Sequence, residues 1–153
     1  LSSLWTVKKD GSGLECQIPA GNWISHYYWK NENRILVTTD ILGKPAYVEF
    51  TPGKKDFQQI GKGILTEDGH CSFSPDKKWI LSDTYPHGEN NQAELFLYNI
   101  KKKKKIILGR FHHDQKYQGT IRCDLHPRFS KDSTIITFDS VHGKKRQIYV
   151  VYC

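Results

Sequence analysis

The sequence predicts an all-β protein built from repeated four-stranded antiparallel sheets, on the strength of three observations. Apolar runs rich in β-branched and aromatic residues alternate with short polar turns. No stretch of the chain shows the 3.6-residue periodicity of an amphipathic helix. A segment that begins with histidine occurs three times in the chain, and the three copies align with one another without a gap. Together these observations indicate short strands arranged in an internal repeat.

The three repeated segments begin at His26, His70 and His126 and read HYYWKNENRILVTTD, HCSFSPDKKWILSDT and HPRFSKDSTIITFDS. Each has an aromatic residue three positions after the histidine, then a polar turn, and an apolar run that begins nine positions after the histidine. Proline presets φ in the turn at 74–76, and serine and aspartate bind local backbone donors there and at 130–132. Each segment therefore predicts a strand, a tight turn and a second strand.

Further strands are expected to complete each sheet. Third strands are predicted at 45–50, 94–100 and 146–152, and fourth strands at 57–61 and 106–111. The opening stretch SLWTVKKDGSG, followed by LECQIPA, matches the third and fourth strands of a preceding sheet. Four short strands recurring every 40 to 50 residues are typical of a β-propeller.

We expect about three and a half blades, because the first and last sheets are incomplete. The predicted blades are a partial one at 1–22, complete ones at 23–66 and 67–120, and a partial one at 121–153. An open arc of blades leaves bare edge strands. We therefore expect the chain to be part of a larger, seven-bladed propeller whose missing blades come from the rest of the protein.

Composition narrows the classes of partner. The net charge of +7 suits a polyanion. The lysine run 101–105 lies between two predicted strands and is interpreted as a solvated hairpin tip, and no nucleic-acid recognition signature accompanies it, so no nucleic-acid partner is expected. No apolar run approaches the ~20 residues that span a bilayer, so no membrane span is expected. The four cysteines are widely spaced without a C-x-x-C pair, which leaves their pairing open.

The repeated histidines are candidate metal ligands. The first strand of each propeller blade lines the axis, so His26, His70 and His126 can converge there, although a hydrogen bond to the next blade is the alternative role. Asp124 and His126 are two residues apart and share a face if their strand is regular, whereas Cys123 points elsewhere unless the strand is bulged. Histidine and carboxylate ligands suit Mn, Zn or Fe, and Cys123, as the rival fourth ligand, favours zinc.

Candidate substrate-binding residues surround the same segment. Arg122 and Arg128 carry fork-shaped donors that suit a carboxylate, with a surface or inter-blade salt bridge as the alternative. Tyr27 and Tyr85 could each stack on a sugar ring or fill the core between blades. The remaining histidines are expected to be solvated loop residues: His87, His112, His113 and His142.

The stretches LWTVKKDGSG…SHYYW, GHCSFSPD and HPRFSKDSTIITFDSVHGK resemble the C-terminal blades of oligogalacturonate lyases, which are propeller-type polysaccharide lyases like the ulvan lyases. The Ser-Pro-Asp hairpins are more distantly similar to TolB-type propeller repeats. The resemblance covers essentially the whole chain and implies a divalent metal at the axis, manganese in that family. It carries a histidine ligand onto His26, and the last histidine of the family's Gln-x-x-His-x-His pattern onto His126.

This chain departs from that pattern, because Asp124 replaces the middle histidine and Ile121 the glutamine. The change is consistent with zinc, as in ulvan lyases. The resemblance implies β-elimination on an acidic polysaccharide or oligosaccharide, with the catalytic base outside this chain and a periplasmic or secreted location, or else a cytoplasmic one. The alternative is a non-catalytic TolB-like propeller that binds a protein or glycan.

Overall fold

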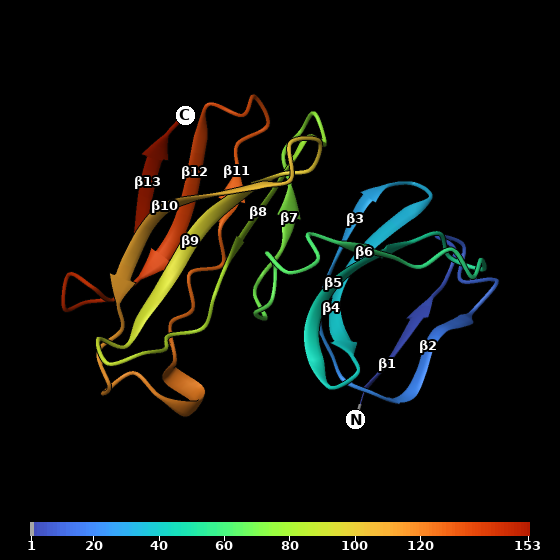
Figure 1. Cartoon of the computed structure of the whole chain (residues 1–153), viewed down its shortest axis with the longest axis horizontal. Coiled ribbons are helices and arrows are strands. Elements are labelled where there is room, and N and C mark those ends of the chain that lie inside the picture. Colours follow the sequence, from blue (N-terminus) through green and yellow to red (C-terminus); the bar gives the residue numbers. More distant parts are fainter. Residues whose placement is uncertain (1) are drawn as a thin grey trace. The chain divides into compact units, whose positions relative to one another are not determined.

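The computed structural model describes residues 2–153, which are mostly β-strand. The chain divides into two compact units, residues 1–68 and 69–153. The sheets of each unit can be followed in Figure 1. A single short helix occurs in the described part of the chain, the 3₁₀ turn η1 (Gly119–Ile121). No helix found there is long and apolar enough to cross a membrane.

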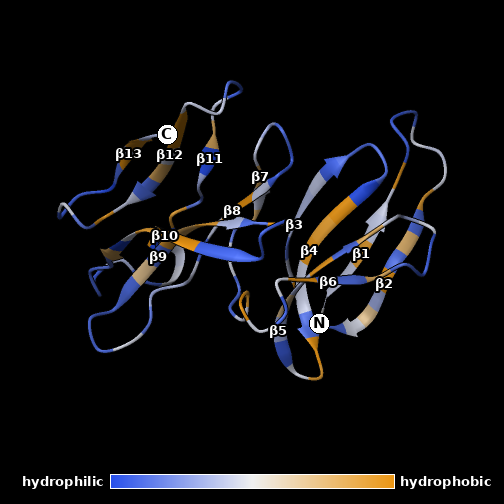
Figure 2. Cartoon of the chain, turned by 45° about the horizontal axis from the view of Figure 1, so that its top comes forward, coloured by the Kyte–Doolittle hydropathy of each residue, from blue (hydrophilic) through white to orange (hydrophobic). Residues whose placement is uncertain are grey.

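The first unit contains a two-stranded and a four-stranded antiparallel sheet. In the two-stranded sheet, β1 (Ser2–Thr6) pairs with β2 (Glu15–Asn22). The four-stranded sheet has the order β3 (Ile24–Asn31), β4 (Arg34–Ile41), β5 (Lys44–Phe50) and β6 (Gln58–Ile60). Apolar residues of β4 and β5 form the core with Leu4 and Ile18 of the smaller sheet. Figure 2 shows the apolar character of β4.

The second unit contains a four-stranded and a three-stranded antiparallel sheet. The four-stranded sheet consists of β7 (Ser72–Phe73), β8 (Trp79–Asp83), β9 (Gln92–Asn99) and β10 (Lys104–His112). The three-stranded sheet consists of β11 (Arg128–Phe129), β12 (Ile135–Ser140) and β13 (Gln147–Tyr152). Their shared core is built from buried side chains of both sheets and of the segment before β11: Leu81, Ala93, Leu95, Leu125, Ile136 and Phe138. Sheets of two, four, four and three strands confirm the predicted all-β partial propeller.

The two serine–aspartate turns form the same hydrogen-bonded structure. Ser74 Oγ donates to Asp76 Oδ1 at 2.7 Å and accepts from Trp79 N at 3.0 Å. Ser130 Oγ likewise donates to Asp132 Oδ1 at 2.6 Å. These serine hydroxyls, with neighbouring donors, lower the pKa of Asp76 and of Asp132 to about 2. Hydrogen bonds between residues at most five apart in the sequence therefore stabilise each hairpin turn.

Two local expectations were wrong, and the expectation for the lysine run was right only in part. Residues 122–127 form no regular strand, because Pro127 has no N–H to donate to a ladder and His126 has a left-handed φ of 42°. In the lysine run, residues 101–104 are exposed at the hairpin turn as expected, but Lys105 lies inside β10, where its Nζ is 2.8 Å from Glu94. His113 is buried rather than solvated, and its Nε2 accepts a hydrogen bond from Cys123 N at 3.4 Å.

Candidate metal centre

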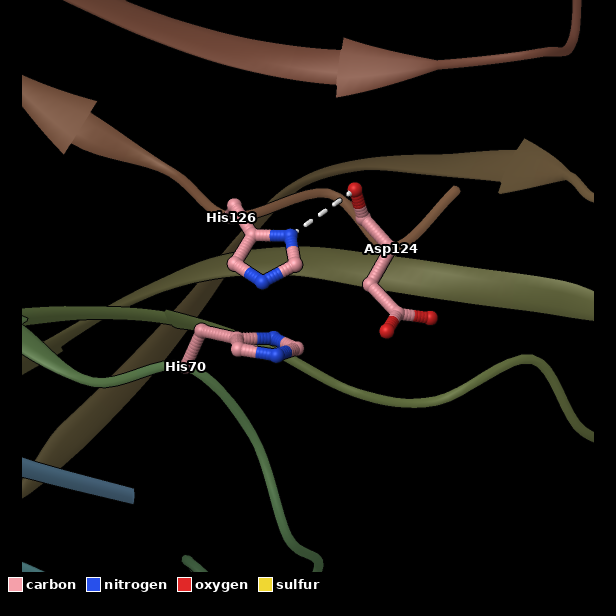
Figure 3. A group of neighbouring side chains, drawn as sticks. All are labelled: His70, Asp124 and His126. Atoms are coloured by element: carbon pink, nitrogen blue, oxygen red, sulfur yellow. Dashed lines mark hydrogen bonds between the residues drawn. The ribbon is translucent and has the colours of Figure 1, made fainter. Parts of the chain in front are cut away.

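Three side chains of the second unit form a group that could hold a metal ion. One ligand atom each of His70, Asp124 and His126 lies within 4.8 Å of the others. The two imidazole rings have centroids 3.8 Å apart and an angle of 38° between their planes. Figure 3 shows the two rings facing one another with the carboxylate of Asp124 beside them. The group therefore joins a residue just before β7 to two residues in the segment before β11.

His70 is fixed by a close approach of two backbone segments. Its backbone N donates to Asp83 Oδ1 at 2.6 Å, and its Nδ1 lies 3.0 Å from both carboxylate oxygens of Asp83. Gly69 makes this approach possible, because a Cβ at that position would overlap the carbonyl oxygen of Asp83 and lie 3.0 Å from Ser82 Oγ. The absence of a side chain at Gly69 thus allows the backbone before His70 to pack directly against the end of β8.

His126 is held in place through its backbone. Its N donates to Asp83 Oδ2 at 3.1 Å, and its Nδ1 lies 3.3 Å from the carbonyl oxygen of Asp124. The left-handed φ of 42° is uncommon for a residue with a side chain, although histidine adopts it more often than most. Unusual backbone conformations of this kind cluster at functional sites.

Asp124 offers an oxygen to this group. Its side chain is 7% exposed, and Arg122 Nε donates to its Oδ2 at 2.9 Å. Arg122 Nε also lies 2.8 Å from Oδ1, but Oδ1 is buried and accepts no hydrogen bond from the described residues. Hydrogen bonding to Asp124 raises the pKa of Arg122. The guanidinium also lies 4.7 Å from the ring centre of Tyr85, which contacts His70 edge-on.

The residues fit a divalent transition metal. Because Nδ1 of His70 and Nδ1 of His126 both face oxygen acceptors, the neutral rings carry their lone pairs on Nε2, the form in which histidine binds metals. Asp124 Oδ1 lies 2.8 Å from Arg122 Nε but accepts no hydrogen bond from the described residues, which leaves its lone pairs available to a metal ion. A ligand set of two nitrogens and one oxygen suits Zn or Mn better than Mg or Ca, which prefer oxygen ligands alone.

Two of the five predicted metal ligands are not in this group. Cys123 is buried, and burial raises the pKa of its thiol, which disfavours the thiolate that binds metals. His26 lies in β3 of the first unit, where its Nε2 is 3.9 Å from Asp68 Oδ2. Ser25 Oγ donates to that same oxygen at 2.7 Å. The structure therefore brings together His70, Asp124 and His126, and gives His26 an acidic neighbour within its own unit.

The three predicted substrate-binding residues have different surroundings. The Arg122 side chain is 47% exposed while it contacts Asp124. Arg128 is also exposed and lies 3.6 Å from Asp139, as the salt-bridge alternative predicts. Tyr27 lies on β3 in the first unit and is 59% exposed.

Sequence reasoning missed Asp83. Its carboxylate is fully buried and contacts both histidines of the group. A signal was present, since Asp83 follows His70 by 13 residues and Asp139 follows His126 by 13. An acidic residue at the end of an otherwise apolar strand requires a partner when it is buried.

The chain matches no protein-family model and no curated protein. Its structure is similar to TolB from Acinetobacter baumannii, with a TM-score of 0.78, 18% identity, and coverage of 98% of this chain and 35% of that one. It is also similar to an oligogalacturonate lyase in complex with manganese, with a TM-score of 0.74, 19% identity, and coverage of 97% and 40%. An oligogalacturonate lyase from Vibrio parahaemolyticus is similar with a TM-score of 0.75 and 17% identity, and the match covers 97% of this chain and 41% of that one.

At these identities the likeness concerns the fold. The chain spans about 35–41% of the length of these three structures. Its strand content, its small antiparallel sheets and these neighbours agree, so the chain has the fold of a partial β-propeller.

Proposed function

We propose that this chain is the C-terminal portion of a propeller-type polysaccharide lyase that cleaves uronic-acid-containing glycans by β-elimination and uses a divalent metal. The observation that carries the proposal is the group of His70, Asp124 and His126, two imidazoles and a buried carboxylate within 4.8 Å. A likeness in fold to an oligogalacturonate lyase in complex with manganese supports it. His26 remains a proposed further ligand, and Cys123 the rival one. Seven blades remain the proposed size of the whole propeller.

The proposed chemistry divides between this chain and the rest of the protein. A base, proposed to lie outside the chain, removes the proton at C5 of the uronate, the C4–O bond breaks with its electron pair on the leaving oxygen, and a C4–C5 double bond forms. A metal held by His70, Asp124 and His126 would supply Lewis-acid charge to the substrate carboxylate. Arg122 offers exposed donors beside the same group, which suit a carboxylate oxygen. The preorganised positive charge would stabilise the carbanion that follows proton loss.

The proposed substrate is an acidic glycan met in the periplasm or outside the cell. The net charge of +7 attracts a polyanion over a distance, which raises the rate of encounter. Arg128 and Tyr27 stay proposed contacts to the glycan, the first through its guanidinium and the second through its exposed ring.

Metal content tests the site directly. We expect about one Zn or Mn per chain by elemental analysis after purification without chelator, and its loss in His126→Ala. His112→Ala is the matched control, because His112 is also exposed and its Nδ1 also donates to a backbone carbonyl, that of Asn90. A metal-free wild-type protein that also takes up neither ion on titration would contradict the site.

Activity separates the lyase from the alternative. The whole protein should release unsaturated uronates, followed by their ultraviolet absorbance, from pectate fragments or ulvan. The alternative is a non-catalytic TolB-like propeller that binds a protein or glycan, which the TM-score of 0.78 to TolB favours. Binding of an acidic glycan without any product, by a protein that holds its metal, would favour this alternative.

A further inference from the structure

The carboxylate of Asp83 lies beneath the two histidines rather than among the ligand atoms. It is 0% exposed and accepts hydrogen bonds from three N–H groups of His70 and His126. His70 contributes its backbone N at 2.6 Å and its Nδ1 at 3.0 Å, and His126 contributes its backbone N at 3.1 Å. A buried carboxylate is costly unless it is fully paired, so these contacts account for its presence.

The contact with Nδ1 decides which nitrogen of His70 faces the group. A carboxylate accepts only, so Nδ1 carries the proton and Nε2 carries the lone pair in the neutral ring. A carboxylate on the far nitrogen also raises the basicity of a histidine ligand and fixes the orientation of its ring. Asp83 therefore prepares His70 for binding a cation through Nε2.

The second contact supports the backbone that carries the His126 ring. The residue has a φ of 42° and precedes Pro127, so its backbone conformation requires support from its surroundings. The bond from its N to Asp83 Oδ2 supplies that support from a strand 43 residues earlier in the chain. One carboxylate therefore contacts both residues whose ring centroids lie 3.8 Å apart.

We propose that Asp83 is the positioning residue of this centre: its carboxylate fixes the Nδ1–H tautomer of His70 and anchors the backbone of His126, so that both Nε2 atoms can bind one divalent cation. The cation-binding part rests on the function proposed above, and the tautomer part does not. Asp139 provides an internal comparison, since it stands 13 residues after His126 as Asp83 does after His70, yet its carboxylate lies 3.6 Å from Arg128.

Two measurements on wild type, Asp83→Asn and Asp139→Asn test the proposal. The first is the affinity for Zn²⁺, measured by competition with a chromophoric chelator. The loss of a carboxylate behind a histidine ligand weakens metal binding by about 10- to 100-fold. We expect that loss in Asp83→Asn and no more than about a twofold change in Asp139→Asn, with circular dichroism showing that each variant is folded.

The second measurement is the tautomer of His70 in the metal-free protein, from the ring ¹⁵N shifts at a pH where the imidazole is neutral. We expect the Nδ1–H form in wild type, and this needs no variant to fold. The Nε2–H form in wild type would overturn the proposal whatever the metal affinity. Equal Zn²⁺ affinity of wild type and Asp83→Asn would also overturn it while leaving the metal site intact. The expected tautomer in a wild type that binds no Zn²⁺ would instead refute the metal site, and with it the cation-binding part.

Discussion

Replacing Gly69 by alanine tests the close approach on which the site depends. A Cβ at this position would overlap the carbonyl oxygen of Asp83 and lie 2.9 Å from its carbonyl carbon. The Cβ would lie only 1.9 Å from that oxygen. Non-bonded heavy atoms normally lie about 3.5–4.0 Å apart, so the two backbone segments must separate by more than about 1 Å. The Asp83 atoms that the Cβ would meet belong to the backbone, so they cannot rotate away as a side chain would. Overpacking of this kind costs about 1–3 kcal/mol, and weakening the bonds from His70 to Asp83 adds about 1 kcal/mol.

We therefore expect Gly69→Ala to lower the free energy of unfolding by about 3 kcal/mol in a urea titration. Gly88→Ala is the control, because a Cβ there meets open space and only the φ of 70° opposes it, at a cost of about 1 kcal/mol. The same shift displaces His70, so Zn²⁺ affinity should fall in Gly69→Ala and not in Gly88→Ala. Equal stability of the two variants, with equal Zn²⁺ affinity, would refute the steric argument.

Three further predictions concern the scaffold. The pKa of Asp76, held at about 2 chiefly by Ser74, lies below its ordinary 3.8, so its stabilisation is complete above pH 3.8 and is lost as the pH falls through about 2; Asp76→Asn should flatten that pH dependence in urea unfolding, and an unchanged slope would contradict it. Leu81→Ala, in the core at 0% exposure, should cost about 3 kcal/mol in thermal unfolding, while Leu42→Ala, at 96% exposure, should cost less than about 0.5. Glu49→Ala leaves two partly exposed cations without their shared buried carboxylate and should cost about 2 kcal/mol by denaturant titration; a neutral result would show that solvent screens both.

The strands and hairpins were predictable because their causes are local. The apolar runs at 35–41 and 79–83 have the β-branched and aromatic residues that favour strands, and the structure has β4 and β8 there. The Ser74–Asp76 turn closes on itself through hydrogen bonds between residues at most five apart. Such features leave their whole signal in a short window of sequence.

The candidate centre was predictable only in part. The repeat directed attention to His70 and His126, whose rings the structure brings together. Asp124 and His126 were expected to share a face of a strand, and that reason was wrong. Residues 122–127 are not a strand, and His126 has a left-handed backbone conformation instead. Asp83 was missed because its role depends on a contact 43 residues away, which no local pattern reports. That these residues bind a metal stays a prediction.

The bond from His126 to Asp83 also has a consequence for hydrogen exchange and unfolding. The 122–127 segment has no strand ladder, and an amide in such a segment would ordinarily exchange with solvent rapidly. The His126 amide donates instead to a fully buried acceptor on β8, so it exchanges only when the segment separates from that strand. The same separation parts the two imidazoles. We therefore expect the histidine pair to separate whenever the 122–127 segment leaves β8, so exchange of the His126 amide reports that opening.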